Sequence, residues 1–166
     1  MLQSRLVKKT AAKDRARIVQ FAWTIVSMNA YFEKIHQFWA KALGITAPQW
    51  SIIVVLAALD EGEGVPVNVV SKKAQVHPSF VTTQSQALEK QGFVRRKASS
   101  KDARIVLLSL TDKSYKQLAE LASRRQDLDA FIFQDLDEAA LLGLVQTLEG
   151  LDDRFAKGVL KLKLDL

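Results

Sequence analysis

The sequence predicts a mainly helical protein with one small β-hairpin, and three observations support this fold class. Apolar residues recur at steps of three and four along most of the 166 residues. Only three prolines and seven glycines interrupt these patterns, which is too few for a flexible linker. Two β-prone runs, residues 93–97 and 105–110, are separated by a short polar loop, and this arrangement indicates a hairpin.

Two helices of unequal length are expected before residue 62. The first runs from about Asp14 to Leu43, is ended by Gly44, and carries an apolar stripe of Phe21, Ile25, Met28, Phe32, Ile35 and Trp39. Thr46, Pro48 and Gln49 then have the pattern of an N-cap, a first-turn proline and a capping-box partner. The buried face of this second helix is expected to hold Trp50, Ile53, Val54 and Ala57.

Two short helices should precede the hairpin, and two long ones should follow it. The short helices are expected at about 68–75 and from His77 or Pro78 to Gly92, the latter with Val81, Ser85 and Leu88 facing inward. After the hairpin, Thr111 and Asp137 are the expected N-caps of the two long helices. An amphipathic tail occupies residues 159–166 and is a further candidate for contact with a partner chain.

Positive charge is concentrated in residues 65–113. This segment holds nine Lys and Arg against three Asp and Glu, a net charge of +6, which equals the formal net charge of the whole chain. The remaining residues carry equal numbers of both signs. A local field of this kind indicates a polyanionic partner.

Composition argues against several other classes of protein. The chain has no cysteine, so disulfides, thiol redox sensing and Cys-ligated zinc are excluded. No signal peptide or membrane span is visible, so we expect a cytoplasmic protein without membrane partners. His36 and His77 lie far apart and no Gly-rich phosphate loop is present, so no enzyme activity, catalytic residue, metal site or cofactor is expected.

The hairpin region carries a specific motif. Residues 88–96 read Leu-Glu-Lys-Gln-Gly-Phe-Val-Arg-Arg, residues 102–104 read Asp-Ala-Arg, and residues 108–111 read Leu-Ser-Leu-Thr. This combination resembles the signature of the MarR family of bacterial transcription regulators, which have a winged helix-turn-helix. The helices on both sides of the motif match as well, so the resemblance covers nearly the whole chain.

The resemblance implies one MarR-like domain over residues 1–166. Its winged helix-turn-helix lobe would span about 46–113, flanked by dimerisation helices at about 1–45 and 114–166. Such a protein would be a ligand-responsive repressor that acts as a homodimer on a palindromic operator in double-stranded DNA, with half-sites roughly 34–36 Å apart. Apolar residues beside the main stripe of the first helix, such as Trp23, Tyr31 and Phe38, also favour a dimer, because one small domain cannot cover them.

The helix after Pro78 is the expected recognition helix. If Val81, Ser85 and Leu88 face the core, a rotation of about 100° per residue turns a polar face outward. Ser, Thr and Gln side chains can bond base edges, whereas a lysine at the far end would meet a phosphate. The candidates for DNA contact are Ser79, Thr82, Thr83, Gln86 and Lys90. The alternative is an ordinary polar surface helix.

The hairpin tip is expected to enter a narrow groove, where the negative potential favours arginine. By resemblance, Arg104 is the minor-groove residue, and Asp102 would hold its guanidinium through a charge-assisted bond. The candidates here are Arg96, Lys97, Lys101, Asp102 and Arg104. A solvated loop with an incidental ion pair is the alternative.

A small aromatic or acyl anion is the expected effector, again by resemblance. His36 could donate a hydrogen bond to a carboxylate, and Trp39 and Trp50 offer flat apolar walls. The alternative for these indoles is an ordinary place in the core. For the whole protein, the alternative is an architectural or protein-interaction winged helix without an effector.

Overall fold

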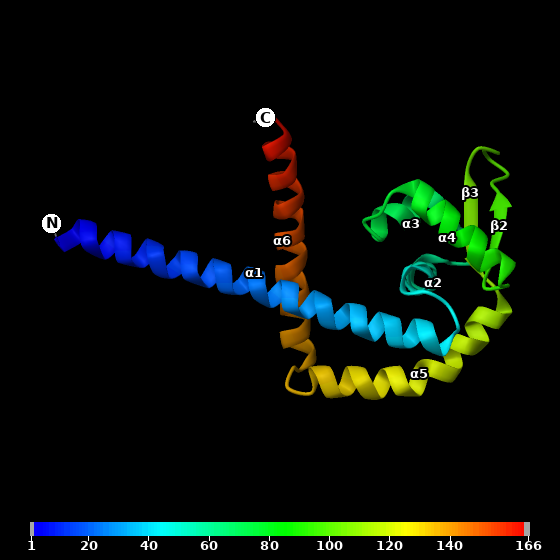
Figure 1. The fold of residues 1–166 in the computed structure, drawn as a ribbon, viewed down its shortest axis with the longest axis horizontal. Helices are drawn as coiled ribbons and strands as arrows, with labels where there is room; N and C mark the ends of the chain where they lie inside the picture. The colour runs from blue at the N-terminus through cyan, green and yellow to red at the C-terminus, as the bar shows by residue number, and fades with distance from the viewer. Residues whose placement is uncertain (1, 165–166) are drawn as a thin grey trace. The chain divides into compact units, whose positions relative to one another are not determined.

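The structure, a computed structural model, describes the backbone of residues 2–164 and the side chains of residues 14–164. It divides into two compact units, residues 1–118 and 119–166. The last two residues of the predicted tail lie outside the described part. The elements are α1 (Leu2–Ala42), α2 (Ala47–Leu59), β1 (Val65–Pro66), α3 (Val67–Lys73), α4 (Pro78–Lys90), β2 (Val94–Ala98), β3 (Val106–Leu110), α5 (Asp112–Phe133) and α6 (Glu138–Leu164) (Figure 1).

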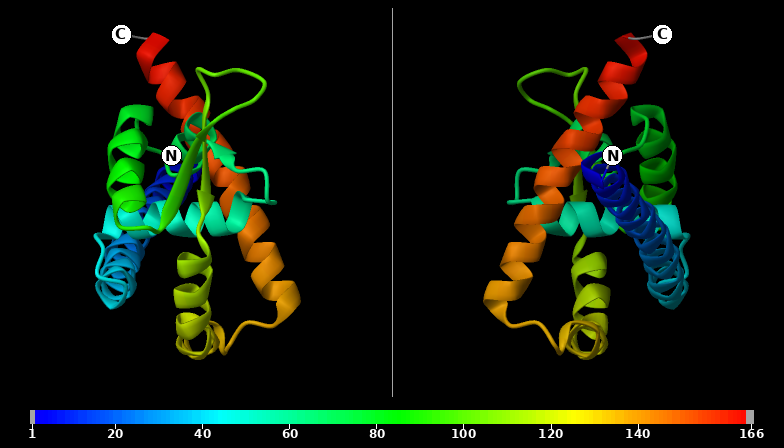
Figure 2. Two further views of the ribbon diagram at one scale, coloured as in Figure 1. Left: turned by 90° about the vertical axis from the view of Figure 1, so that its right-hand side faces the viewer. Right: turned by 90° about the vertical axis from the view of Figure 1, so that its left-hand side faces the viewer.

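The expected hairpin is part of a three-stranded antiparallel sheet with the order β1-β3-β2. β2 and β3 pair over their full length, from Val94 opposite Leu110 to Ala98 opposite Val106. The two-residue strand β1, which the sequence did not reveal, pairs Val65 with Leu108. Figures 1 and 2 show the hairpin beside α4, with its loop projecting beyond that helix. The predicted mainly helical fold with a small β wing is therefore confirmed.

The core of unit 1 joins α2, α3, α4 and the sheet. Ile53, Leu56, Val81, Leu88 and Leu108 are fully buried in it. Two capping predictions for α2 are confirmed: the Thr46 hydroxyl accepts a hydrogen bond from Gln49 N–H (3.4 Å), and the Gln49 amide oxygen accepts one from Thr46 N–H (3.0 Å).

The predicted buried face of α2 is partly wrong. Ala57 is exposed and Val54 half-buried, whereas Ile52 joins Trp50, Ile53 and Leu56 among the buried residues. The sequence of α2 is apolar on nearly every side, so spacing alone could not select the inward face. The surroundings of this helix decide it, because α1, α3, α4 and β3 all contact α2.

α1 begins at Leu2, well before the expected start near Asp14. No glycine or proline stands between these positions, so nothing in the sequence interrupts the helix. It ends as predicted at Gly44, whose φ of +70° is readily adopted by glycine. Trp39 and Ala40 are buried near this end, but Ile18, Trp23, Tyr31 and Phe38 are each more than half exposed.

Unit 2 contains the remainder of α5 and all of α6. Asp137 caps α6 as expected, since its carboxylate accepts a hydrogen bond from Ala140 N–H (2.7 Å). None of the described residues of α6 is buried. The inward residues expected from helical spacing are Leu141, Leu144, Val145, Leu148 and Leu151. Of these, Leu141 and Leu151 are half-buried and the other three are at least 36% exposed within this chain.

Candidate DNA-binding surface

The outward face of α4 has the composition that the sequence predicted. Val81, Ser85 and Leu88 are completely buried, which fixes the rotation of the helix. Ser79, Thr83, Gln86 and Lys90 are all exposed on its other side, and Thr82 is half-buried at the edge. These four polar side chains can therefore contact a molecule outside the chain.

Local hydrogen bonds order the start of this face. His77 is the N-cap of α4: its Nδ1 accepts from Ser79 N–H (3.3 Å) and lies 2.7 Å from the Ser79 hydroxyl. One turn later, the Thr83 hydroxyl donates to the Ser79 carbonyl (3.1 Å). Hydroxyl oxygens retain acceptor capacity in such bonds, so Thr83 can still accept a hydrogen bond from a donor group on a base edge.

The tip of the hairpin holds one arginine in a defined direction. Arg104 donates from Nε to Asp102 Oδ1 (3.0 Å) and from Nη2 to Oδ2 (2.9 Å), and its backbone N–H donates to Oδ1 (3.0 Å). The expected contact between these two residues is therefore present. The Arg104 side chain is nevertheless 91% exposed, so its remaining N–H groups face solvent.

This pair also changes the acidity of both groups. The side-chain bond from Arg104, followed by its backbone bond, lowers the pKa of Asp102 below its ordinary value. The same side-chain bond raises the pKa of Arg104. Both groups stay charged at neutral pH, and the carboxylate screens part of the positive charge on the wing.

Lys97 and Lys101 lie on the same hairpin and are exposed. The loop between the strands is closed by hydrogen bonds from Ser99 N–H to the Ile105 carbonyl (2.8 Å) and from Lys101 N–H to the Ser99 hydroxyl (3.2 Å). A folded loop of this kind presents its cations from a fixed backbone.

Arg96, grouped with these free cations by the sequence, lies differently. Its side chain is only 13% exposed and contacts Thr82, Ser85 and Glu89 of α4 instead of projecting from the wing. The alternation of β2 explains this orientation, because Arg96 shares its face with the buried Val94. That period-two signal was present in the sequence, and Glu89 was not among the candidate residues.

The first turn of α5 makes a second set of contacts that sequence reasoning missed. The Thr111 hydroxyl donates to the Gly92 carbonyl (2.8 Å), the Ser114 hydroxyl to the Phe93 carbonyl (2.5 Å), and Lys113 Nζ to the Gln91 carbonyl (2.8 Å). Three consecutive carbonyls directly after α4 are thus satisfied by α5, which ties this helix end to the recognition helix. The predicted N-cap Thr111 was the only signal for this junction.

The proposed effector residues lie in less open places. Trp39 and Trp50 are 5% and 1% exposed, whereas His36, one turn before Trp39 on α1, is half-buried. The indoles therefore belong to the interior of unit 1. Among the described residues, no group of three or more His, Asp or Glu is placed to hold a metal ion.

Comparisons with known proteins agree with this geometry. Residues 45–106, from the start of α2 to the start of β3, match the MarR family model. The chain is similar to the MarR family. A curated relative, the HTH-type transcriptional repressor MdtR of Bacillus subtilis (strain 168), is 29% identical over 120 residues, which cover 70% of this chain and 76% of the relative.

Solved structures show the same fold. AbsC, a MarR family transcriptional regulator from Streptomyces coelicolor, superposes with a TM-score of 0.69 at 21% identity, covering 83% of this chain and 94% of AbsC. CouR from Rhodococcus jostii RHA1, solved bound to p-coumaroyl-CoA, gives a TM-score of 0.68 at 17% identity, covering 79% of this chain and 90% of CouR.

MarR proteins are DNA-binding transcription regulators and not enzymes, and these matches support a regulator of that kind. Among the described residues, no single helix has both the length and the apolar character of a membrane span. The length and apolar character of a span are reached only by two helices taken together, Asp14–Ala42 and Ala47–Leu59, and these meet at a bend of 89°.

Proposed function

We propose that this protein is a sequence-specific repressor that binds a palindromic operator as a homodimer. The observation that carries this proposal is the combination of an exposed polar face on α4 with the exposed, carboxylate-held Arg104 on the adjoining wing. A helix with this face suits the major groove, and an arginine at a hairpin tip suits the minor groove beside it.

Each candidate residue except Arg96, which is treated below, has a definite role in this proposal. Ser79, Thr83 and Gln86 read base edges, and Arg104 enters the minor groove with Asp102 as its support. Lys90, Lys97 and Lys101 contact phosphates. Thr82 lies at the edge of the helix face, where its backbone carbonyl accepts a hydrogen bond from Arg96.

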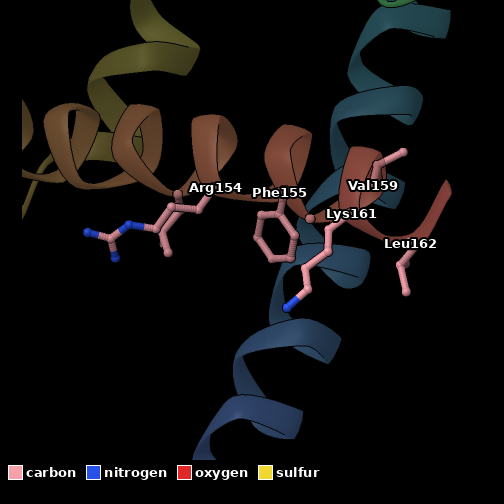
Figure 3. A pocket seen from close by; sticks show the side chains of 7 residues that line it. Arg154, Phe155, Val159, Lys161 and Leu162 are labelled. Carbon is pink, nitrogen blue, oxygen red and sulfur yellow. The ribbon is translucent and has the colours of Figure 1, made fainter. Parts of the chain in front are cut away.

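The proposed dimer rests on apolar surface that one chain leaves uncovered. Trp23 on α1 is 69% exposed, and Phe155 and Leu162 on α6 are 64% and 67% exposed. Figure 3 shows Phe155, Val159 and Leu162 projecting from α6, and all residues lining the hollow beside them belong to that one helix. We propose that residues 1–45 and 114–166 form the dimer contact and that residues 46–113 form the DNA-binding lobe.

Selection of bound duplexes from a random pool, followed by footprinting, tests the proposed mode of DNA binding. We expect a palindrome whose half-sites lie about 34–36 Å apart. Binding to every duplex with equal affinity would overturn the proposal and favour the architectural alternative. We expect the protein to act in the cytoplasm, where an operator is accessible.

We also propose that a small aromatic or acyl anion releases the protein from its operator by binding near His36, Trp39 and Trp50. The fold shared with CouR, which binds p-coumaroyl-CoA, supports this class of effector. Because Trp39 and Trp50 are buried, the anion would meet the half-buried His36 first.

Titration with p-coumaroyl-CoA, read by indole fluorescence and by operator binding, tests the effector site. Each tenfold loss of DNA affinity requires a preference of about 1.4 kcal/mol for the released arrangement, and DNA must weaken effector binding by the same factor. His36→Ala should weaken this response, with Trp39→Phe as a second variant that preserves bulk. An unchanged response in both variants would show that the site lies elsewhere.

A further inference from the structure

We infer that Arg96 is a positioning residue for operator recognition, which fixes the wing at one angle to the recognition helix and does not itself touch DNA. This inference rests on the proposed sequence-specific binding of DNA and assigns one residue a role within it. It begins from the unusual place of Arg96, a cation of the basic segment that turns away from solvent.

The contacts of Arg96 all lead to one stripe of α4. Nη1 donates to the Thr82 carbonyl (3.4 Å) and to the Ser85 hydroxyl. Nε lies 3.6 Å from Glu89 Oε2, and the backbone N–H of Arg96 donates to Glu89 Oε1 (3.2 Å). Main chain and side chain of a single β2 residue are thus both fastened to the helix, at positions spaced by three and four residues.

This arrangement depends on the shape of arginine. A guanidinium offers several N–H groups in a rigid plane, so it can bond a carbonyl, a hydroxyl and a carboxylate together. The ammonium group of lysine is a single point on a flexible chain and cannot hold the same three directions. The Arg96 side chain is 13% exposed and that of Glu89 is 45% exposed, so solvent screens this pair less than a fully exposed pair.

Arg95 provides the matched contrast. It is the preceding residue on β2 and faces the other side of the strand. Its ion pair with Asp112 spans 3.8 Å between side chains that are 65% and 97% exposed. Ion pairs this exposed contribute little to stability. Two neighbouring residues of identical type therefore differ only in what they contact, which isolates the effect of the contact with α4.

The functional consequence follows from the two-groove geometry. The polar face of α4 and the Arg104 tip must enter neighbouring grooves together, and the angle between them decides whether both fit. A loosened wing still carries its exposed cations, so attraction to phosphates persists. The preference for the operator over other DNA sequences declines instead.

The test compares Arg96→Gln with Arg95→Gln, since both variants remove one positive charge. Affinity is measured for the selected operator and for a scrambled duplex of equal length over a range of salt concentrations. For Arg96→Gln we expect about a tenfold fall in the ratio of operator to scrambled affinity, with the wild-type salt slope retained. Arg95→Gln should leave the ratio unchanged.

Loss of about 0.9 from the magnitude of the salt slope in Arg96→Gln would instead show a phosphate contact and overturn the inference, while the proposed function would stand. A wild-type protein without any preferred duplex would remove the proposed function itself. Glu89→Gln is the second variant should Arg96→Gln fold poorly: it removes the ion pair but keeps an oxygen that accepts from Arg96 N–H. Its affinity ratio should fall less than tenfold, and an unchanged ratio would also contradict the inference.

Discussion

The winged helix, from α2 to β3, and the terminal helices α1 and α6 place similar side chains in opposite surroundings. Leu56, Val81 and Leu108 in the winged helix are completely buried. On the terminal helices, Trp23, Phe155 and Leu162 are 64–69% exposed. Burial of apolar surface is the main favourable contribution to folding, so the winged helix contains its own source of stability.

Apart from Trp39 and Ala40 at the end of α1, the described side chains of these two helices lack such a source within one chain. Long apolar faces that the chain itself leaves open indicate an interface rather than a core. The buried residues of the winged helix therefore serve the fold of one chain, and the exposed apolar residues of α1 and α6 belong to the proposed dimer contact. The following predictions test this separation.

The largest effect is expected from shortening a buried side chain in the winged helix. Leu108→Ala should lower the free energy of unfolding by about 2–5 kcal/mol, because it leaves a cavity where α2, α4 and the sheet meet. Urea denaturation measures this loss, at a protein concentration low enough to keep the chain monomeric. Leu160→Ala makes the same chemical change at a residue of α6 that is 60% exposed. It should lower the free energy of unfolding far less in the same experiment. Equal losses would erase the distinction between the two regions.

A charge on the apolar face of α6 should affect assembly instead of the fold. Phe155→Glu is expected to dissociate the dimer and to weaken operator binding about a hundredfold, because two tethered half-sites become independent. Sedimentation should shift from about twice 18.5 kDa to the monomer mass. Gln146→Glu, which adds the same charge at another exposed position of α6, is the control. A wild-type protein that is already monomeric and binds its palindrome tightly would contradict the proposed dimer.

Within the winged helix, truncation should distinguish attraction from readout. Arg104→Ala should weaken binding to all duplexes and reduce the salt slope by roughly 0.9 if it contacts a phosphate, or reduce the preference for A/T-rich flanks if it lies in the minor groove. Gln86→Ala should relax preference at one or two base pairs, by about 1–3 kcal/mol at most. Binding measured across an operator mutation series separates these patterns. Identical, unselective losses would argue that α4 reads no bases.

The smallest effect is expected at Asp102. Asp102→Asn removes the support of Arg104 and one negative charge near the DNA, so binding to scrambled duplexes should strengthen slightly while the operator preference declines. Because the pKa of Asp102 is lowered, the carboxylate stays ionised at pH values below its ordinary pKa as well, and its contribution is lost only as pH falls through the lowered pKa. The wild-type to variant affinity ratio should therefore stay constant from pH 8 to pH 6. A ratio that changes within this window would show that another group governs the tip.

Local signals in the sequence predicted much of the winged helix. The capping box of Thr46 and Gln49 and the breaks at Gly44 and Gly92 are set by residues close together in the chain, and all appear in the structure. The inward residues Val81, Ser85 and Leu88 followed from helical spacing on an amphipathic segment. Where local chemistry has a single solution, sequence reasoning is sufficient.

The differences arise where distant segments decide. α2 is apolar all round, so its neighbours select which residues are buried. The inward turn of Arg96 depends on acceptors that α4 provides, and a charged residue on a basic hairpin masked the strand alternation. β1 is two residues long and exists only through its pairing with β3. The DNA-contacting and effector residues stay predictions.

The position of α1 at the beginning of the chain has a consequence for synthesis. A ribosome finishes α1 before it reaches α6, and the intervening residues take on the order of 5–20 s at about 5–20 residues per second. During that time the chain exposes Trp23, Tyr31 and other apolar residues of α1 but has not yet made α6, the other helix of the proposed dimer contact. The winged helix, in which β2 and β3 pair over a short separation, can form meanwhile. Newly made chains are therefore expected to need chaperone protection at α1. This need should be smallest where two ribosomes on one message release their products close together, so that two chains can pair at once.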